Sequence, residues 1–544
     1  MILRRIEAIP RFRVRIRRGP RPLRELIVLL FVFSARFVGC NSIDAPDTSP
    51  VLGSESLTAA DVQTLIAHAV EQAGRLGQEV AVAVTDREGN VLGAFVMTGA
   101  PAGVDISLCE QSAPAVVAAA VSTADEAIQK ARTAAFLSSN QHGFSTLTAC
   151  FITRPHFPPA LTNLPAGPLF GVPFSSLPGS DIQPNGSGLS GAPGGVPLYK
   201  NGILVGGLGV SGGDDLAGFH LCSCEGAVAD EIISLGAVIG YAVPDEKRGD
   251  AIYIDGIRFL FANAAPPPGN FTLTYADVSP ARGTEIVAPS APPAPRFPTT
   301  GEVVLAGLGP AFDFSIRAGS LLTAGDVRTI IDQAAAQAAR TRAAIRRPPG
   351  VPAQVFVSVV DVDGSVLGIW RTPEATLFSF DVSAQKARTA LAFSLASDLL
   401  GQRLRTTLGL AASAEIAMST RAVGFLSQDF FPPGIDEQTL GRPVSAGPFF
   451  RIQQNYAGVV GFGSFFDPPH RNGLTIFPGG IPLYKGAQLV GAIGISGDGV
   501  DQDDLISFAG ARGFEPPAAI RSDNFFYDGV RLPYVKLPRQ PELE

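Results

Sequence analysis

The chain of 544 residues has few of the side chains that most often carry chemistry. It has five His, five Cys, three Met and one Trp, and only 17% of its residues are charged. The apolar run at residues 26–34 is shorter than the about 20 residues that a bilayer-spanning helix needs. Because 46% of the residues are apolar, the sequence excludes a disordered chain and predicts sizeable cores.

Excess positive charge is confined to the N-terminus. Residues 1–39 hold ten Arg and two Glu, a net charge of +8, so the rest of a chain that carries −7 in total carries −15. Nucleic acids and anionic membranes require basic patches on their partners. We therefore expect no nucleic-acid partner.

The same N-terminus resembles an export signal. A basic stretch precedes the apolar run, and FVGC at residues 37–40 resembles a bacterial lipobox with Phe37 in place of the usual Leu. We predict a signal peptide over residues 1–40, lipidation of Cys40 and a tether over residues 41–56. The protein is then an outer-membrane lipoprotein, or is periplasmic or extracellular, and meets the membrane only through its lipid anchor.

The rest of the chain contains a tandem duplication. Residues 57–258 read again as residues 322–531, a unit of roughly 210 residues, too long for a solenoid repeat. Matched segments include LTAADVQTLI and LTAGDVRTII, the two QKARTA segments, PGGVPLYK and PGGIPLYK, and LVGGLGVSG and LVGAIGISG. We predict one domain over residues 57–263, a Pro-rich linker over residues 264–315 and a second domain over residues 316–535.

Each copy shows the same order of elements. A helix capped by Thr58 or Thr323, with Asp three residues later, is followed by a hairpin and an Ala-rich helix with the QKARTA segment. A long Gly/Pro-rich excursion, a second hairpin and an acidic-led helix complete the unit. This order predicts an α+β fold in which helices cover an antiparallel sheet.

Four cysteines lie in the first copy: Cys109, Cys150, Cys222 and Cys224. An even number of cysteines in an exported protein indicates local disulfides. A metal site is the alternative, but Cys-x-Cys is not the usual zinc spacing. We predict disulfides and no metal site.

The shared motifs resemble the GlcG/HbpS family of heme-binding-like proteins, which includes the C-terminal domain of PduO. These motifs are the D-x-x-G-x-x-L/V hairpin, K-A-x-T-A and F-x-G-G-x-P…V-G-A-I-G-V-S-G, the last matched most closely at residues 477–497. The resemblance implies a profilin-like fold, often in larger oligomers. It also implies heme binding outside the cell in some members and a lyase acting on hydroxylaminobenzoate in one branch. Family membership therefore indicates the fold more firmly than the function.

Histidine is the usual axial ligand of heme iron. None of the five is matched in the other copy: His68, His142, His156, His220 and His470. This excludes a His–iron mechanism that operates in both copies. His156, just before Phe157, is the best candidate for a heme ligand, and a structural role is its alternative.

Lysine gives a stronger signal, because four of the six lysines form matched pairs, Lys130 with Lys386 and Lys200 with Lys485. A threonine follows the first pair three residues later, on the same helical face. In the family this helix borders the pocket, so a cation and a hydroxyl would hold a carboxylate there: Lys130 with Thr133, and Lys386 with Thr389. The alternative is a lysine that pairs with a carboxylate such as Asp86 or Asp361.

Both copies also carry a PGG turn, which gives Gly194, Gly195, Gly479 and Gly480. Glycine lets the backbone approach a ligand closely, and we include these four residues in the predicted ligand site. A turn that leads into a strand requires the same residues, which is the alternative.

We expect an exported protein whose two domains pack as an internal pseudo-dimer and bind heme or another small carboxylated ligand. No catalytic residue is assigned. One alternative is a lyase acting on small aromatic hydroxylamines, with Lys130, Lys386 or His156 as its acid or base. The other is a non-catalytic scaffold or interaction protein of the cell envelope.

Overall fold

The structure is a computed structural model of the whole chain. It describes residues 55–104, 121–159, 161, 164–172, 180–184, 188–213, 224, 226, 228–265, 269–435, 441, 444–450, 452 and 470–537. The predicted signal peptide, Cys40 and most of the tether lie outside these residues, as do Cys109, Cys222 and His220. Within the described residues, no helix has the length and apolar character needed to cross a membrane.

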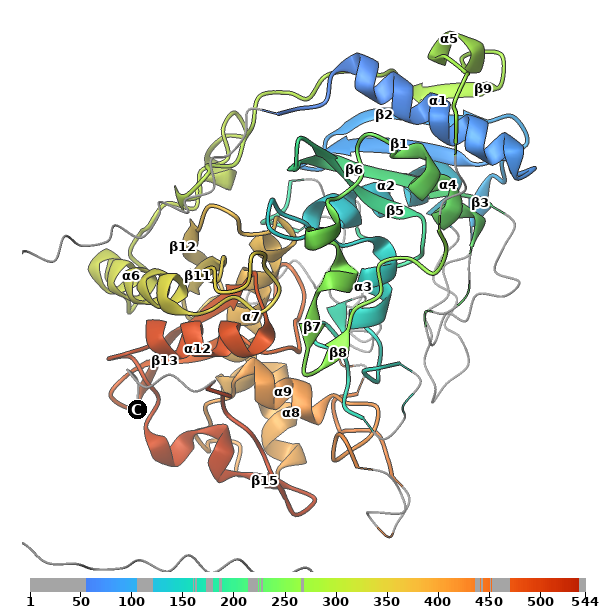
Figure 1. Ribbon diagram of the computed structural model, residues 1–544. Coiled ribbons are helices and arrows are strands. Elements are labelled where there is room, and N and C mark those ends of the chain that lie inside the picture. The colour runs from blue at the N-terminus through green and yellow to red at the C-terminus, as the bar shows by residue number, and fades with distance from the viewer. Residues whose placement is uncertain are drawn as a thin grey trace, which may run out of the picture. The chain divides into compact units, whose positions relative to one another are not determined.

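The first copy contains one five-stranded antiparallel sheet, in the order β5-β6-β1-β2-β9. Its elements are α1 (Ala59–Arg75), β1 (Ala81–Asp86), β2 (Val91–Met97), β3 (Gly103–Val104), β4 (Val121–Ser122), α2 (Thr123–Phe136), α3 (Thr146–Ile152), β5 (Gly195–Lys200), β6 (Ile203–Ser211) and α4 (Ala229–Ala237). A small hairpin of β7 (Tyr253–Ile254) and β8 (Ile257–Arg258) closes the copy. In Figure 1, helix α1 lies across strands β1 and β2.

The second copy repeats this plan, with its sheet in the order β10-β12-β11-β14-β13. Its elements are α6 (Ala324–Arg340), β11 (Phe356–Val360), β12 (Val366–Arg371), α7 (Phe378–Ser394), α8 (Leu399–Thr407), α9 (Thr420–Leu426), β13 (Gly480–Lys485), β14 (Gln488–Ser496), α12 (Val500–Gly510), β15 (Phe526–Tyr527) and β16 (Val530–Arg531). The prediction of two tandem α+β domains, each an antiparallel sheet covered by helices, is confirmed.

The segment between the copies contributes to both sheets. Besides a short helix α5 (Tyr275–Val278), it contains β9 (Gly283–Val287), which pairs with β2, and β10 (Gly301–Glu302), which pairs with β12. The predicted Pro-rich linker therefore supplies an edge strand to each copy.

The first helix of each copy begins at a capping box. The Oγ1 atom of Thr58 accepts a hydrogen bond from the Asp61 N–H at 3.1 Å, and the Asp61 carboxylate accepts one from the Thr58 N–H at 2.7 Å. Thr323 and Asp326 do the same in the second copy. Capping in this way satisfies N–H groups that a helix leaves without partners. The matched lysines of the second hairpins donate to these aspartates: Lys200 to Asp61 at 3.0 Å, and Lys485 to Asp326 at 2.8 Å.

Helices cover both faces of each sheet. In β1, Val82 and Val84 belong to the core beneath α1 and α4, whereas Ala81 and Ala83 pack toward α2. The alternation follows from the two-residue period of a strand. Small residues on the second face let the QKARTA helix approach closely: a Cβ atom at Gly209 would lie 2.0 Å from the Ala127 carbonyl oxygen. The Gly-rich strand is therefore a helix-packing surface.

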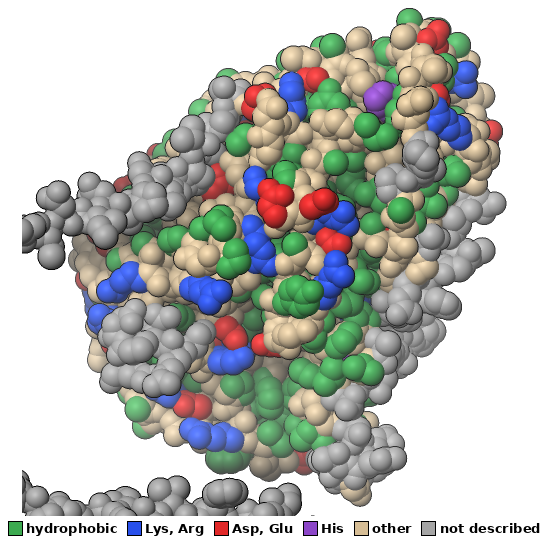
Figure 2. Space-filling view, in the orientation of Figure 1, with side chains coloured by type: hydrophobic (Ala, Val, Ile, Leu, Met, Phe, Trp, Pro, Cys, Tyr) green, Lys and Arg blue, Asp and Glu red, His purple; other side chains and the backbone are tan. Residues whose placement is uncertain are grey.

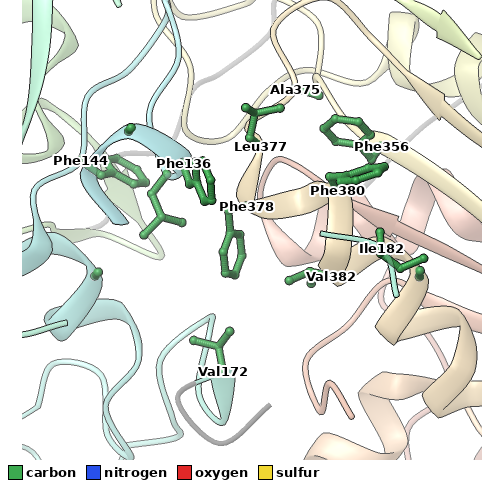
Figure 3. Packing of buried hydrophobic residues seen from close by; sticks show 14 of the residues in the cluster. Phe136, Phe144, Val172, Ile182, Phe356, Ala375, Leu377, Phe378, Phe380 and Val382 are labelled. Carbon is green, nitrogen blue, oxygen red and sulfur yellow. The ribbon is translucent and has the colours of Figure 1, made fainter. Parts of the chain in front are cut away.

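The two copies share one hydrophobic core. Figure 3 shows Phe136 and Phe144 of the first copy together with Phe378 and Phe380 of the second. Polar contacts support this packing: the Asn140 side chain donates to Glu374 at 2.9 Å, and the Asn140 N–H donates to Glu374 at 2.8 Å. The copies thus pack against each other within one chain, as the predicted internal pseudo-dimer requires.

One predicted disulfide is present. Cys150, in α3, is bonded to Cys224, which precedes α4, and both residues are buried. This confirms the disulfide prediction for the two candidate cysteines that the structure describes.

Removal of a shared aromatic ring should destabilise the whole body. Phe380 is fully buried and its ring lies against Phe297, Phe314 and Phe356, so Phe380→Ala should lower the free energy of unfolding by about 3–5 kcal/mol. Phe526→Ala, at a residue 58% exposed, is the control and should change it by less than about 0.5 kcal/mol. Urea denaturation measures both, and equal effects would contradict the packing of Phe380 in this core.

Removal of the disulfide should also destabilise the protein. The bond joins residues 74 positions apart, and cross-linking a loop of that size constrains the unfolded chain by about 4 kcal/mol. Cys150→Ala combined with Cys224→Ala should therefore lower the denaturation midpoint under oxidising conditions. Under reducing conditions the wild type should approach the variant. A variant that melts with the wild type would show that the bond does not form.

Candidate functional site

The matched lysines of the QKARTA helices form buried ion pairs. Lys386 Nζ donates to Asp503 Oδ2 at 2.8 Å and to the Ile495 carbonyl oxygen at 2.8 Å. Lys130 Nζ makes the same pair of contacts, with Asp230 Oδ2 and the Val210 carbonyl oxygen, each at 2.9 Å. Each lysine therefore ties its helix to the end of a strand and to the start of the closing helix.

The carboxylates named as alternative partners, Asp86 and Asp361, are not those partners. Asp86 accepts hydrogen bonds within its own turn, and Asp361 accepts them from Ser320. The reason lies in the register: Ser496, at the end of β14, pairs with Phe356, at the start of β11, whereas Asp361 follows the other end of β11. Lys386 thus lies over the end of the sheet where α12 begins.

Burial changes the protonation chemistry of this pair. Removal from water raises the pKa of Asp503 to about 7 and lowers the pKa of Lys386, while their mutual attraction opposes both shifts. The Lys386 ammonium also lies 4.9 Å from the centre of the Phe477 ring. The Lys386 ammonium is therefore held by Asp503 Oδ2 and the Ile495 carbonyl oxygen, whereas Asp503 Oδ1 is buried without a hydrogen-bond partner among the described residues.

The predicted threonines and glycines lie at the same junction. The Thr133 hydroxyl accepts from the Ser190 N–H at 2.8 Å, and the Thr389 hydroxyl from the Thr475 N–H at 3.0 Å. Gly195 N–H and Gly480 N–H donate to two threonine hydroxyls, each at 2.9 Å, which belong to Thr146 and Thr420. Thr146 and Thr420 were not predicted as site residues, although the Ser-Thr pairs at residues 145–146 and 419–420 match between the copies.

The remaining predicted glycines allow a close approach. Gly194 and Gly479 have φ of +115° and +117°, and a Cβ atom on either would lie within 3 Å of a strand carbonyl oxygen. These backbone conformations favour glycine. The PGG turn thus brings each second hairpin into contact with the QKARTA helix.

A cavity of about 1270 Å³ adjoins this junction in the second copy. Pro478, Ser496 and Asp503 form part of its wall, so that Lys386 and Gly479 lie directly behind the lining. Both copies contribute aromatic rings to it, among them Phe144, Phe157, Phe259, Phe378, Phe425 and Phe477. None of the eight predicted ligand residues is among the described residues that line it: Lys130, Thr133, Gly194, Gly195, Lys386, Thr389, Gly479 and Gly480.

Charged side chains gather along the α12 side of this cavity. Arg421 bonds to Asp501 at 2.6 Å and also contacts Asp504, and Lys536 bonds to Asp501 at 2.6 Å. Arg342 also lines the cavity and is exposed, and it forms no ion pair within the described residues. Near the centre of the face shown in Figure 2, Lys and Arg side chains lie beside Asp and Glu side chains.

The described histidines are engaged in hydrogen bonds. His142 lines the cavity, but its Nδ1 atom lies 3.0 Å from Ser139 Oγ and its Nε2 atom 3.0 Å from the Leu137 carbonyl oxygen. Burial lowers the pKa of His142 well below its ordinary value, so the ring is neutral. His156 contacts the Leu164 carbonyl oxygen at 2.9 Å and is not among the described residues that line the cavity.

The structure thus contains two α+β domains in tandem and a cavity lined by residues of both copies. The sequence pattern of the family "Haem degrading protein HbpS-like" matches residues 57–217 and 322–512. The chain therefore belongs to the HbpS-like family and carries that domain twice.

Comparison with individual proteins gives more distant similarities. Corrinoid adenosyltransferase PduO of Salmonella typhimurium is 27% identical over 163 residues, and that of Citrobacter freundii is 26% identical over 163 residues. Each alignment covers 30% of this chain and 33% of the relative, so the chain spans about a third of the length of these curated relatives.

Three solved structures are also similar to parts of the chain. They are Klebsiella pneumoniae protein ORFY (20% identity, 35% of this chain and 88% of that chain, TM-score 0.21), the PduOC:heme complex (19%, 35% and 92%, 0.22) and HbpS (23%, 35% and 92%, 0.19).

Replacement of one member of the buried ion pair should cost more than replacement of both. Lys386→Met leaves Asp503 buried without its cation and should lower the free energy of unfolding by about 3–5 kcal/mol. Lys386→Met combined with Asp503→Leu should recover part of that loss. Chemical denaturation of the two variants measures the difference. A lysine that serves only a ligand would instead leave the stability of the single variant unchanged.

Proposed function

We propose that the protein binds a large, mostly apolar ligand with carboxylate groups in the cavity between its two copies, and that a tetrapyrrole such as heme is this ligand. The observation that carries the proposal is the cavity itself. Its volume of about 1270 Å³ lies above the roughly 300–1,000 Å³ of most small-molecule pockets. Its aromatic lining suits a broad apolar ring system.

The comparisons add support for a tetrapyrrole. The family description refers to haem degradation, and one similar solved structure is a complex of PduOC with heme. Heme combines a large apolar ring with carboxylates, which is the chemistry that an aromatic cavity with a cationic residue would hold.

Arg342 is the residue that we assign to a ligand carboxylate. Its guanidinium group is exposed, lines the cavity and has no ion-pair partner within the described residues. A guanidinium group binds a carboxylate through two parallel hydrogen bonds. Lys536, whose side chain is 57% exposed, lies in the same lining but is paired with Asp501.

The cavity fits the ring and its carboxylates better than it fits iron. Both ring nitrogens of His142 are engaged, and coordination of a metal would break at least one of these contacts. His156, the sequence-based candidate for an iron ligand, is likewise held by Leu164. We therefore place no iron–histidine bond in this cavity.

The lyase alternative has less support. Two of the acid–base groups it would use, Lys130 and Lys386, are committed to buried ion pairs with Asp230 and Asp503.

Loss of the Arg342 charge should weaken binding. In a titration of residues 41–544 with hemin, followed through the Soret band, Arg342→Ala should raise the Kd about tenfold, because one charge-assisted contact contributes about 1.5 kcal/mol. Arg340→Ala, in the exposed last turn of α6, is the matched control and should leave the Kd unchanged. A hemin response that never saturates would remove the proposal.

Binding should not depend on iron. Metal-free protoporphyrin IX should bind within about threefold of the Kd of hemin, since the described histidines offer no free ring nitrogen to the cavity. Fluorescence and absorbance titrations measure the two constants. A preference for hemin of a hundredfold or more, lost in His156→Ala, would instead establish histidine ligation.

Export and lipidation also remain part of the proposal. The buried Cys150–Cys224 disulfide supports an oxidising compartment. Mass spectrometry of the N-terminal peptide from membrane fractions would detect a lipidated Cys40, and an intact peptide that runs through Cys40 would exclude it.

A further inference from the structure

Equivalent positions of the two copies are fixed by matched hydrogen bonds. Gly195 and Gly480, at the start of β5 and β13, each donate to the first residue of the helix that precedes the strand, Thr146 of α3 or Thr420 of α9. At the closing helix, the Asn263 N–H donates to Glu231, as the Lys536 N–H donates to Asp504. Together with the Lys–Asp pairs, these contacts show which residue of the second copy corresponds to which residue of the first, both near the QKARTA helix and near the closing helix.

By this correspondence, four cavity-lining residues of the second copy are equivalent to four residues of the first. The equivalent pairs are Arg421 with Leu147, Gly424 with Cys150, Asp501 with Val228, and Pro533 with Leu260. In the second copy all four residues line the cavity. We call the part of the cavity wall formed by these four residues the corner. It contains the ion pair of 2.6 Å between Arg421 and Asp501, and Gly424 adds no side chain to it.

In the first copy the same corner is filled. Leu147, Cys150 and Val228 form a buried apolar cluster with Cys224, and Leu260 packs against it. The disulfide adds a covalent bond across this cluster. Cys224 has no solvent exposure, so its sulfur occupies the interior of the corner.

We propose that the two pseudo-equivalent positions have diverged, so that the chain holds one tetrapyrrole site, beside Lys386 and Asp503, while the disulfide-bonded cluster occupies its counterpart beside Lys130 and Asp230. This inference rests on the proposed function. It makes Arg421, Asp501 and Pro533 the residues that keep the second-copy corner open and polar. Cys150 and Cys224 then close the first-copy corner.

The physical basis is the difference between the two corners. An apolar cluster that is both buried and cross-linked cannot admit a ligand without loss of its packing and of the covalent bond. The ion pair of the second copy is partly exposed, with side-chain exposures of 19% and 24%, and lies along a space that exists without rearrangement.

The test is the binding stoichiometry of metal-free protoporphyrin IX on the wild-type protein of residues 41–544, followed by a conversion variant. The wild type should bind one equivalent per chain. Arg421→Leu, Asp501→Val and Pro533→Leu combined, which give the second-copy corner the first-copy residues, should weaken that binding at least about thirtyfold. Leu147→Met combined with Leu260→Met is the matched control and should leave stoichiometry and Kd unchanged.

Each outcome separates the two proposals. Two equivalents bound per chain, or unchanged affinity in a folded conversion variant, would overturn the single-site inference while the proposed function stands. Absence of saturable binding to the wild type would overturn the proposed function itself. If the conversion variant does not fold, as judged by circular dichroism, Pro533→Leu alone replaces it with the same expected direction of change.

Discussion

The buried contact between a lysine of the central helix and an aspartate of the closing helix holds the structure around the cavity together. Lys386 and Asp503 are both nearly inaccessible to water, and each would be costly to bury alone. Their bond sets where α12 begins relative to β14. Because the loop between these elements, and Asp503 itself, form the cavity wall, the shape of the cavity depends on this ion pair.

The same contact in the first copy shows that a matched residue does not have to be a ligand. Lys130 and Asp230 repeat the geometry of their counterparts, yet the corner beside them is packed with apolar side chains and a disulfide. Residues that match between the two copies therefore maintain the fold that the copies share. Differences between the copies, as at Arg421 and Leu147, are where the two sites diverge.

Much of the fold could be predicted from the sequence, because its signals are local. The capping boxes at Thr58 and Thr323, the hairpins and the apolar periodicity all depend on neighbouring residues. The partner of Lys386 could not be predicted in this way, since Asp503 lies 117 positions away and the register of β14 decides the contact. The cavity was not predicted either, because residues from separate segments of both copies line it, and several of them, such as Arg342, have no match in the other copy.

Hydrogen–deuterium exchange with and without metal-free protoporphyrin IX tests the central claim most directly. Binding in the cavity predicts slower exchange for the backbone amides of residues 341–345, 424–428 and 496–503, from three separate segments that line it. Amides around Lys130 should exchange as before. Protection confined to the first copy, or protection absent from those three segments despite saturation, would contradict the assignment of the cavity as the ligand site.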